Sequence, residues 1–387
     1  MKLVILQEKL KEGLKIIERI FPKSLSLPIL NNVLIKAEKN FLNLAITDLE
    51  IGIKYWTLAK IEKEGELLIP TLLFSNLFNL LPNKQLEFQK KDDFLMVKCD
   101  NYSTKIKTFS TEDYPLFPET IKDNYFEIES KIFCKGLEQV VEITSLQSRP
   151  EFSGVYIIVN KEVIKLVTTD SFRLGEKTLF AEKLKTIYNL SEKEVAFILP
   201  QKTAKEVINI FKPKKGRLRI YLSPNHILFE RMMEEIKHPE IQLTSRLIEG
   251  EYPAYQEIIP KKYETQIILN KNEFVNQLKI ASVFSDKNNE IKIKIEPKKE
   301  EITISSRNFD YGEYESLIKG KIKGKPLEIF FNHRFLIHGL ALIETNEVFF
   351  GLNNEESPAV LKPVDDQTYL YIVMPINPTI EPVNKNA

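Results

Sequence analysis

The sequence predicts an α+β protein made of three tandem, similar domains with antiparallel sheets. One order of elements occurs three times along the chain: an amphipathic helix, a strand pair, a second helix and a second strand pair. Equivalent points, Pro70, Pro200 and Asn332, lie 130 and 132 residues apart. This spacing fits a whole domain rather than a solenoid repeat. Segment 291–297 alternates apolar and polar residues, as half-buried antiparallel strands do.

The six helices are predicted from apolar residues at helical spacing. The first helix of each repeat covers residues 9–20, 131–144 and 269–287. The second helix follows a buried strand each time and covers residues 70–82, 199–217 and 331–345.

The strands are bounded by turn residues. A strand that runs into a polar turn recurs at 42–52, 164–175 and 302–312. Residues 218–230 are predicted to form a hairpin that turns at Pro224 and Asn225, and residues 369–376 a continuous apolar strand.

Polar links that carry proline separate the repeats. We therefore expect an N-terminal, a central and a C-terminal domain, followed by a flexible tail that contains two prolines and no periodicity. The predicted boundaries are 1–121, 122–261, 262–376 and 377–387.

Composition is that of a soluble globular protein, with 43% hydrophobic and 28% charged residues. Cys99 and Cys134 lie in apolar or amphipathic runs, so we expect buried, reduced thiols in a cytoplasmic protein. The N-terminal residues lack the apolar core of a signal peptide. No uncharged apolar run approaches the roughly 18 residues of a membrane span.

Catalytic and metal-binding patterns are not found in the sequence, so we expect no enzyme activity, no metal and no cofactor. The histidines are not spaced as metal ligands are. Asp48 and Asp170 each follow a threonine at matching positions in two repeats. A Thr-Asp pair after a strand accepts backbone N–H groups and fixes a turn, which we prefer to an acid/base role.

Two of the predicted helices carry a net positive charge. Residues 9–20 carry a net charge of +2 and residues 199–217 one of +5, although the whole chain carries only +1. Helices on one side of the molecule would form a positive surface for phosphates, without a motif that reads bases. Lysine-rich helix faces can also be merely solvated, and the charge pattern leaves both readings open.

Seven short segments, in order and at the right spacing, carry a family resemblance. They are SLPILNNVLI (26–35), LAITDLEIGI (44–53), RPEFSGVYI (149–157), TTDSFRLG (168–175), TSRLIEGEYPAYQEIIP (244–260), YLYIVMPI (369–376) and the opening helix. Together they resemble the bacterial DNA polymerase III beta subunit, the DNA sliding clamp family. The resemblance implies a head-to-tail dimeric ring of the DNA-clamp fold, with helices inside and sheets outside. Such a ring encircles duplex DNA and confers processivity without catalysis.

The resemblance also implies partners and sites. The implied partners are double-stranded DNA and a second copy of the chain. Four further kinds of partner would bind through short peptides: the replicative polymerase alpha subunit, the clamp loader, other polymerases and repair proteins. The peptide cleft would comprise Phe152, Thr169, Phe172, Arg173, Leu174, Pro253, Ile258, Ile372, Met374, Pro375 and Ile376. DNA contacts would come from Lys23, Arg149, Lys202 and Lys205, and the dimer interface from Ile106, Val283 and Phe284.

Three departures from the family pattern affect these expectations. Segment 229–241 is longer than the family's tight connection and suggests a loop insertion. The 377–387 tail could cover the cleft. Glu257 occupies a position that is often basic in relatives.

Alternatives to the ring remain open at this point. They are a non-specific or regulatory DNA-binding protein without ring topology, an enzyme using the Asp48 and Asp170 turns, and a sequence-specific DNA-binding protein using helix 199–217.

Overall fold

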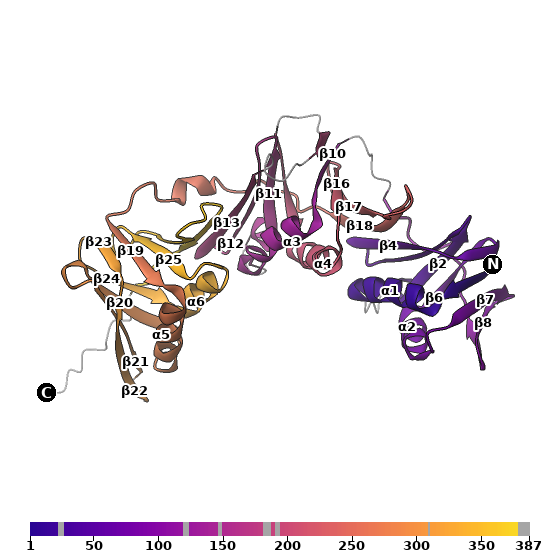
Figure 1. The fold of residues 1–387 in the computed structure, drawn as a ribbon, viewed down its shortest axis with the longest axis horizontal. Helices are drawn as coiled ribbons and strands as arrows, with labels where there is room; N and C mark the ends of the chain where they lie inside the picture. The colour runs from indigo at the N-terminus through magenta and orange to yellow at the C-terminus, as the bar shows by residue number, and fades with distance from the viewer. Residues whose placement is uncertain are drawn as a thin grey trace. The chain divides into compact units, whose positions relative to one another are not determined.

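The chain divides into two compact units. The computed structural model describes residues 1–21, 27–118, 124–145, 149–180, 187–189, 194–308 and 310–377. Unit 1 contains Met1–Lys135 and Ala181–Glu249, and unit 2 contains Gly136–Phe180 and Gly250–Ala387. Figure 1 shows the elements of both units.

Unit 1 contains two antiparallel sheets. Their strand orders are β5-β1-β7-β8-β9 and β14-β10-β16-β17-β18-β4-β3-β2-β6. The strands of these sheets are β1 (Lys2–Leu6), β2 (Asn32–Glu38), β3 (Phe41–Thr47), β4 (Ile51–Leu58), β5 (Lys60–Lys63), β6 (Gly65–Pro70), β7 (Gln85–Lys91), β8 (Phe94–Cys99), β9 (Tyr102–Lys107), β10 (Tyr125–Glu129), β14 (Ile187–Asn189), β16 (Arg217–Leu222), β17 (His226–Met232) and β18 (Pro239–Arg246). Strand β15 (Glu194–Pro200) belongs to neither of these two sheets. The helices of unit 1 are α1 (Gln7–Ile17), α2 (Thr71–Leu80), α4 (Gln201–Phe211) and the start of α3 (Ser130–Glu138).

Unit 2 also contains two sheets. Within the residues of unit 2, the strands run in the orders β11-β12-β13-β27-β26-β25-β19-β23 and β22-β21-β20-β24. The strands are β11 (Gly154–Asn160), β12 (Val163–Thr169), β13 (Arg173–Phe180), β19 (Thr265–Asn270), β20 (Glu290–Glu296), β21 (Glu301–Asn308), β22 (Gly312–Lys319), β23 (Lys321–Gly324), β24 (Leu327–Asn332), β25 (Glu347–Leu352), β26 (Ala359–Pro363) and β27 (Tyr369–Val373). The helices are α5 (Lys271–Val283) and α6 (His333–Ala341).

Short 3₁₀ helices connect several of these elements. They are η1 (Glu18–Ile20), η2 (Pro28–Asn31), η3 (Val141–Ile143), η4 (Pro150–Ser153), η5 (Tyr255–Ile258) and η6 (Pro297–Lys299).

Strand ladders join neighbouring sequence repeats. In unit 1, β18 pairs with β4 from Ile241↔Tyr55 to Ser245↔Ile51. In unit 2, β13 pairs with β27 from Arg173↔Val373 to Lys177↔Tyr369. The central repeat therefore pairs with the first repeat through β18 and with the third repeat through β13. For this reason each compact unit contains part of the central repeat.

The helices bury one apolar face each. On α1, Leu10, Leu14 and Ile17 recur at helical spacing and are fully buried, as expected of an amphipathic helix. In unit 1, Phe74 and Phe78 of α2 pack against Phe88 of β7. Full burial of such a ring contributes about 1.5–3 kcal/mol.

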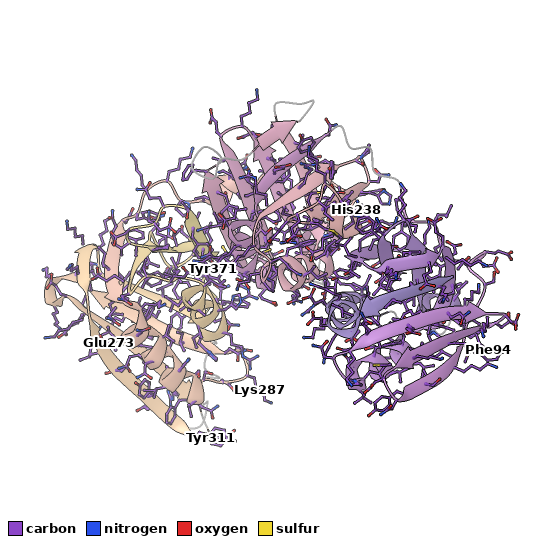
Figure 2. The ribbon with its side chains drawn as sticks, turned by 45° about the vertical axis from the view of Figure 1, so that its right-hand side comes forward. Phe94, His238, Glu273, Lys287, Tyr311 and Tyr371 are labelled. Carbon is purple, nitrogen blue, oxygen red and sulfur yellow. The ribbon has the colours of Figure 1, made fainter. Side chains whose placement is uncertain are left out.

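The aromatic core of unit 2 is built in the same way. Phe274 of α5 and Phe331 of β24 both lie against Phe350 of β25, with ring centroids 5.9 and 6.0 Å apart. Tyr371, labelled in Figure 2, is fully buried and donates a hydrogen bond from its hydroxyl to the Phe335 carbonyl oxygen at 2.9 Å. This bond ties β27 to α6.

The structure confirms a helix within each of the six predicted ranges and the hairpin at 218–230, although α3 ends at Glu138 and not at residue 144. Cys99 and Cys134 are both buried, as predicted. The 369–376 prediction was too long, because β27 ends at Val373.

Two predictions in unit 1 were wrong in extent. Helix α4 ends at Phe211, so the basic residues after it do not belong to a helix; Lys214 instead pairs with Glu240 at 3.0 Å. Most of the predicted 229–241 insertion is strand: β17 continues to Met232 and β18 begins at Pro239. Only 233–238 connects them.

Candidate partner-binding site

The turn between β12 and β13 is fixed by the Thr-Asp pair. The Asp170 carboxylate accepts hydrogen bonds from the backbone N–H groups of Phe172 and Arg173, both at 3.0 Å. The Thr169 hydroxyl accepts one from Ser171 at 3.2 Å. Ser171 has a φ of 78°, which the side-chain bonds help to hold. This confirms the structural reading of the pair and leaves Phe172 59% exposed.

Arg173 links this turn to helix α6. Its Nε donates to Asp170 at 2.8 Å, and its guanidinium lies 4.7 Å from the centre of the Phe335 ring. Burial opposes the charge of Arg173, but Tyr371 and the Asp170 carboxylate outweigh it and raise the pKa of the guanidinium. The Phe172 ring also faces Phe335, with centroids 6.3 Å apart. Phe172, Arg173 and Phe335 therefore form one cluster.

The segment after β27 completes the cluster. The backbone N–H of Met374 donates to the Phe172 oxygen at 2.8 Å, and that of Ile376 donates to the Phe330 oxygen at 2.9 Å. Met374, Pro375 and Ile376 are half-buried. Half-buried aliphatic, methionine and aromatic side chains of this kind can accept the apolar anchors of a peptide.

Four other predicted cleft residues are buried and do not form part of the exposed surface. Leu174 and Ile372 are paired across β13 and β27 and are each 1% exposed, so they are core. Thr169 is buried within its turn, and Phe152 is buried with its ring 5.9 Å from that of Tyr252.

The 250–260 segment is anchored to β13. The Tyr255 hydroxyl donates to Glu176 of β13 at 2.7 Å. On the same short helix, η5, Ile258 is 47% exposed, and Pro253 just before it is also exposed. Pro253 and Ile258 therefore offer exposed apolar side chains on a segment that a hydrogen bond holds to β13.

Comparison with known proteins reveals a consistent relationship along the chain. Three family profiles match in succession: DNA polymerase III beta subunit, N-terminal domain, over residues 1–118; central domain, over 127–254; and C-terminal domain, over 256–377. This chain belongs to the DNA polymerase III beta subunit family.

Individual members of the family are distant relatives. The "Beta sliding clamp" of Synechococcus elongatus is 24% identical over 97% of this chain and 99% of its own length. That of Staphylococcus epidermidis is 24% identical over 93% of this chain and 94% of its own.

Solved structures share the fold. The DNA polymerase sliding clamp from Pseudomonas aeruginosa superposes with a TM-score of 0.89 at 23% identity, covering 98% of this chain and 100% of that one. The clamp from Bacillus subtilis gives 0.89 at 22% identity, with the same coverage. The predicted fold of three tandem α+β clamp domains is confirmed.

Sequence reasoning missed three residues of the cluster in this beta-subunit chain. Phe330, Phe335 and His338 lie in or next to α6, which was predicted as a helix without a role at the cleft. Burial and the neighbouring Arg173 lower the pKa of His338. The aromatic run Phe330, Phe331 and Phe335 was the available signal, but a core helix has the same pattern.

The predicted DNA-contacting residues differ in exposure and in ion pairing. Lys23 lies outside the described residues. Arg149 is exposed just before η4 in unit 2. Lys202 of α4 is exposed and forms an ion pair with Asp48 in unit 1, while Lys205 is half-buried on the same helix.

The predicted dimer residues lie at two sheet edges. Ile106 belongs to β9, the edge strand of its sheet, and points inward with 4% exposure. Val283, at the end of α5, is 69% exposed. Phe284 stacks on Tyr314 of edge strand β22, with centroids 6.0 Å apart.

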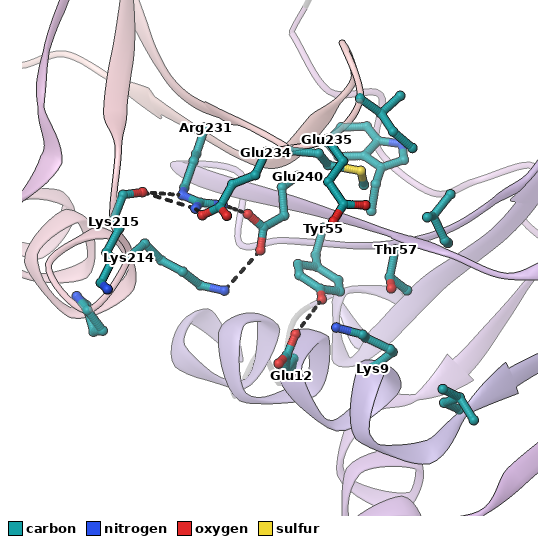
Figure 3. Close-up of a pocket in the computed structure, with 16 residues that line it drawn as sticks. Lys9, Glu12, Tyr55, Thr57, Lys214, Lys215, Arg231, Glu234, Glu235 and Glu240 are labelled. Atoms are coloured by element: carbon teal, nitrogen blue, oxygen red, sulfur yellow. Dashed lines mark hydrogen bonds and ion pairs between the residues drawn. The ribbon is translucent and has the colours of Figure 1, made fainter.

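A cavity of about 680 Å³ in unit 1 is separate from these residues (Figure 3). It lies between α1, the end of β4 and the β17–β18 hairpin. The Lys214 ammonium donates to Glu240 at 3.0 Å, and the Tyr55 hydroxyl to Glu12 at 3.4 Å; burial lowers the pKa of Lys214. The basic and acidic side chains of the wall are equal in number, so the cavity has no net charge that would attract an ion.

Among the described helices, none combines the length and the hydrophobicity that a bilayer-spanning segment requires. No three histidine, cysteine, aspartate or glutamate side chains of the described residues are grouped so that they could hold a metal ion.

Proposed function

We propose that this protein is a DNA sliding clamp: two copies close into a ring around duplex DNA and tether the replicative polymerase to its template. The observation that carries the proposal is the ordered match of all three beta-subunit domains along one chain. The domains would be 1–121, 122–261 and 262–376, with a 377–387 tail, and the protein would act in the cytoplasm. Enclosure, not catalysis, would provide the activity.

Ring closure is supported by two free sheet edges. Strand β9 ends one sheet of unit 1, and β22 ends one sheet of unit 2. Unpaired edge strands readily pair with another chain. Strand β9 carries exposed Lys105 and Lys107, and β22 carries exposed Glu313 and Glu315. Different, oppositely charged edges favour a head-to-tail assembly, which forms a ring if the rotation closes.

The helices supply charge for DNA. Five of the six described α-helices, α1, α3, α4, α5 and α6, each carry a net charge of +1. Lys202 and Lys205 belong to α4, and Lys23 and Arg149 would add to the helices; all these contacts would be to phosphates, weak and independent of base sequence. Weak contacts let a ring slide, while enclosure prevents its loss.

The Phe172 cluster would receive short peptides. Its apolar side chains suit the anchors of segments from the polymerase alpha subunit, the clamp loader, other polymerases and repair proteins. Tethering a polymerase through such a peptide keeps its local concentration at the template high, which is the physical basis of processivity.

The deciding experiment compares closed circular with linearised plasmid. The protein is loaded by a clamp loader and then washed at moderately high salt, which weakens phosphate contacts. We expect retention on the circle and loss from the linear form, because a ring slides off free ends. Equal loss from both would replace the clamp by a non-specific or regulatory DNA-binding protein without ring topology.

A further inference from the structure

Strand β23 forms a free edge of the larger sheet of unit 2. It pairs on one side with β19, from Thr265↔Gly324 to Ile268↔Lys321, and ends the strand order there (Figure 1). The backbone N–H and C=O groups on its outer side therefore point away from the sheet. An edge of this kind can accept a further strand from another chain.

The face of β23 that turns away from the core carries two lysines. Ile322 is 7% exposed and packs into the core. Its neighbours Lys321 and Lys323 project from the opposite face, because successive side chains of a strand alternate, and both are exposed. Lys319 and Lys325 are exposed two residues before and after them. We call these four lysines the lysine ridge.

The two central lysines of the ridge have neutral neighbours on the adjoining strand. Across the β19–β23 ladder, Lys321 lies opposite Ile268 and Lys323 lies opposite Gln266. Neither neighbour carries a charge that could offset an ammonium group. The centre of the ridge is therefore positive.

The two outer lysines of the ridge each have an acidic neighbour. Lys319 lies opposite Glu301 in the β21–β22 ladder, and Lys325 forms an ion pair with Glu264 at 2.8 Å. Both side chains of the second pair are exposed, and exposed ion pairs are weak. An incoming carboxylate can therefore compete for Lys325.

The corresponding edge strand of unit 1 carries mixed charges. Strand β5 follows β4 and precedes β6, as β23 follows β22 and precedes β24, and it also ends its sheet. Its exposed charged side chains are those of Lys60, Glu62 and Lys63, and Glu62 pairs with Lys2 of the neighbouring strand at 2.5 Å. The position of β23 in the repeat therefore does not require an edge on which every charge is a lysine.

We propose that the β23 edge binds an acidic peptide segment of a partner protein, which adds to the sheet as an extended strand. The backbone of the segment would hydrogen-bond to the free side of β23. Glutamate or aspartate side chains at every second position would face the lysine ridge, and opposite charges at opposed positions stabilise a strand pair. The contact needs neither ring closure nor the Phe172 cluster.

The charges and the free backbone favour an acidic peptide over two other occupants. A second copy of the same edge would bring lysine against lysine, which opposes pairing. DNA would supply phosphates for the ammonium groups but no row of amide groups for the backbone of β23. An extended acidic segment satisfies both the backbone and the charges.

The first test measures the affinity of the full-length protein for a fluorescein-labelled peptide that alternates glutamate with valine and threonine. Lys321→Glu combined with Lys323→Glu should weaken binding at least tenfold in fluorescence anisotropy, and added salt should weaken the wild-type complex. The matched control, Lys60→Glu combined with Lys63→Glu, places the same charges on β5 and should bind as the wild type does. No binding by the wild type, an unchanged affinity of the β23 double variant, or equal losses in both double variants would overturn the inference.

Charge reversal gives a second readout that a loss of the fold cannot imitate. A second peptide carries lysine in place of each glutamate. It should bind the double variant of Lys321→Glu and Lys323→Glu at least threefold more tightly than it binds the wild type, because the charges are again opposite. Without this reversal, the peptide does not lie along β23.

Two further probes separate strand addition from a general attraction of anions. A peptide of the same composition with its glutamates in one block would turn half of them away from the ridge when extended, and should bind at least threefold more weakly than the alternating peptide. Equal affinities of these two peptides would make the ridge a general anion surface and overturn the inference. Tighter binding of single-stranded oligothymidylate than of the alternating peptide, abolished in the β23 double variant, would replace the peptide site by a nucleic-acid site.

Discussion

Two turns of the chain share one backbone design but have different neighbours. At Thr47–Asp48 in unit 1, Asp48 accepts from the N–H groups of Glu50 and Ile51 at 3.0 and 2.7 Å, and Leu49 has a φ of 77°. The turn at Thr169–Asp170 repeats this pattern. Yet Asp48 pairs with an exposed lysine, whereas Asp170 pairs with Arg173 beneath an exposed phenylalanine. The same local scaffold thus serves as plain structure in one unit and as part of a candidate binding surface in the other.

Removing the two aspartates tests this contrast most strongly. Asp170→Ala leaves the mostly buried Arg173 without its carboxylate, and loss of one partner of a buried pair costs about 3 kcal/mol or more. Asp48→Ala loses the same turn bonds but only an exposed ion pair, so we expect about 1 kcal/mol. Urea unfolding of both variants measures the difference. Equal losses of unfolding free energy in the two variants would mean that the Asp170–Arg173 ion pair does not stabilise its turn.

Side chains at the tips of the turns should differ in peptide binding. Phe172→Ala removes an exposed ring of the candidate cleft and should weaken a peptide with aliphatic and aromatic anchors about tenfold, or 1.4 kcal/mol. Glu50→Ala changes the equivalent exposed position in unit 1 and is the control. Fluorescence anisotropy of a labelled peptide gives both affinities. Unchanged peptide affinity of Phe172→Ala would show that the peptide does not bind at Phe172.

Acid should destabilise the Asp170 turn through His338 of α6. Burial and Arg173 lower the pKa of His338, against opposing effects of Glu142 and Asp170. The unfolded chain therefore binds the proton more readily, so stability is full above the unfolded pKa of about 6.5 and falls as pH drops below it. His338→Gln should flatten this fall in thermal melts across pH 5–8.

The control for the acid effect is His226→Gln in unit 1, which removes a histidine far from α6 in the sequence. An equal flattening in both variants would show that His338 has no special part in the acid response.

The exposed ion pair at the first turn should have the smallest effect. Lys202→Ala removes the partner of Asp48, and exposed pairs contribute about 0.2–1 kcal/mol that salt screens. Melting curves at low and high salt should differ from wild type only at low salt. A larger loss that persists in high salt would indicate that Lys202 supports the turn in another way.

Prediction from sequence succeeded where the physics is local. Thr and Asp bond to N–H groups two or three residues away, so the 47–52 and 169–174 turns could be predicted from spacing alone. The helices followed from apolar periodicity, with errors at their ends: α4 stops at Phe211, and the lysines beyond it could not be distinguished from helix residues by charge. The 229–241 segment was predicted as a loop insertion, but most of it extends two strands. In the sequence, both alternatives consist of the same extra residues.

The sequence by itself determined the repeat, the helices, the turns and, through its motifs, the family. The tertiary structure decided which distant segments meet. The ladder of β13 with β27 joins residues about 200 positions apart and brings Met374 to Phe172, while Phe335 reaches the same place from α6. Such contacts depend on how whole sheets and helices pack, whereas a turn depends only on hydrogen bonds within a few residues.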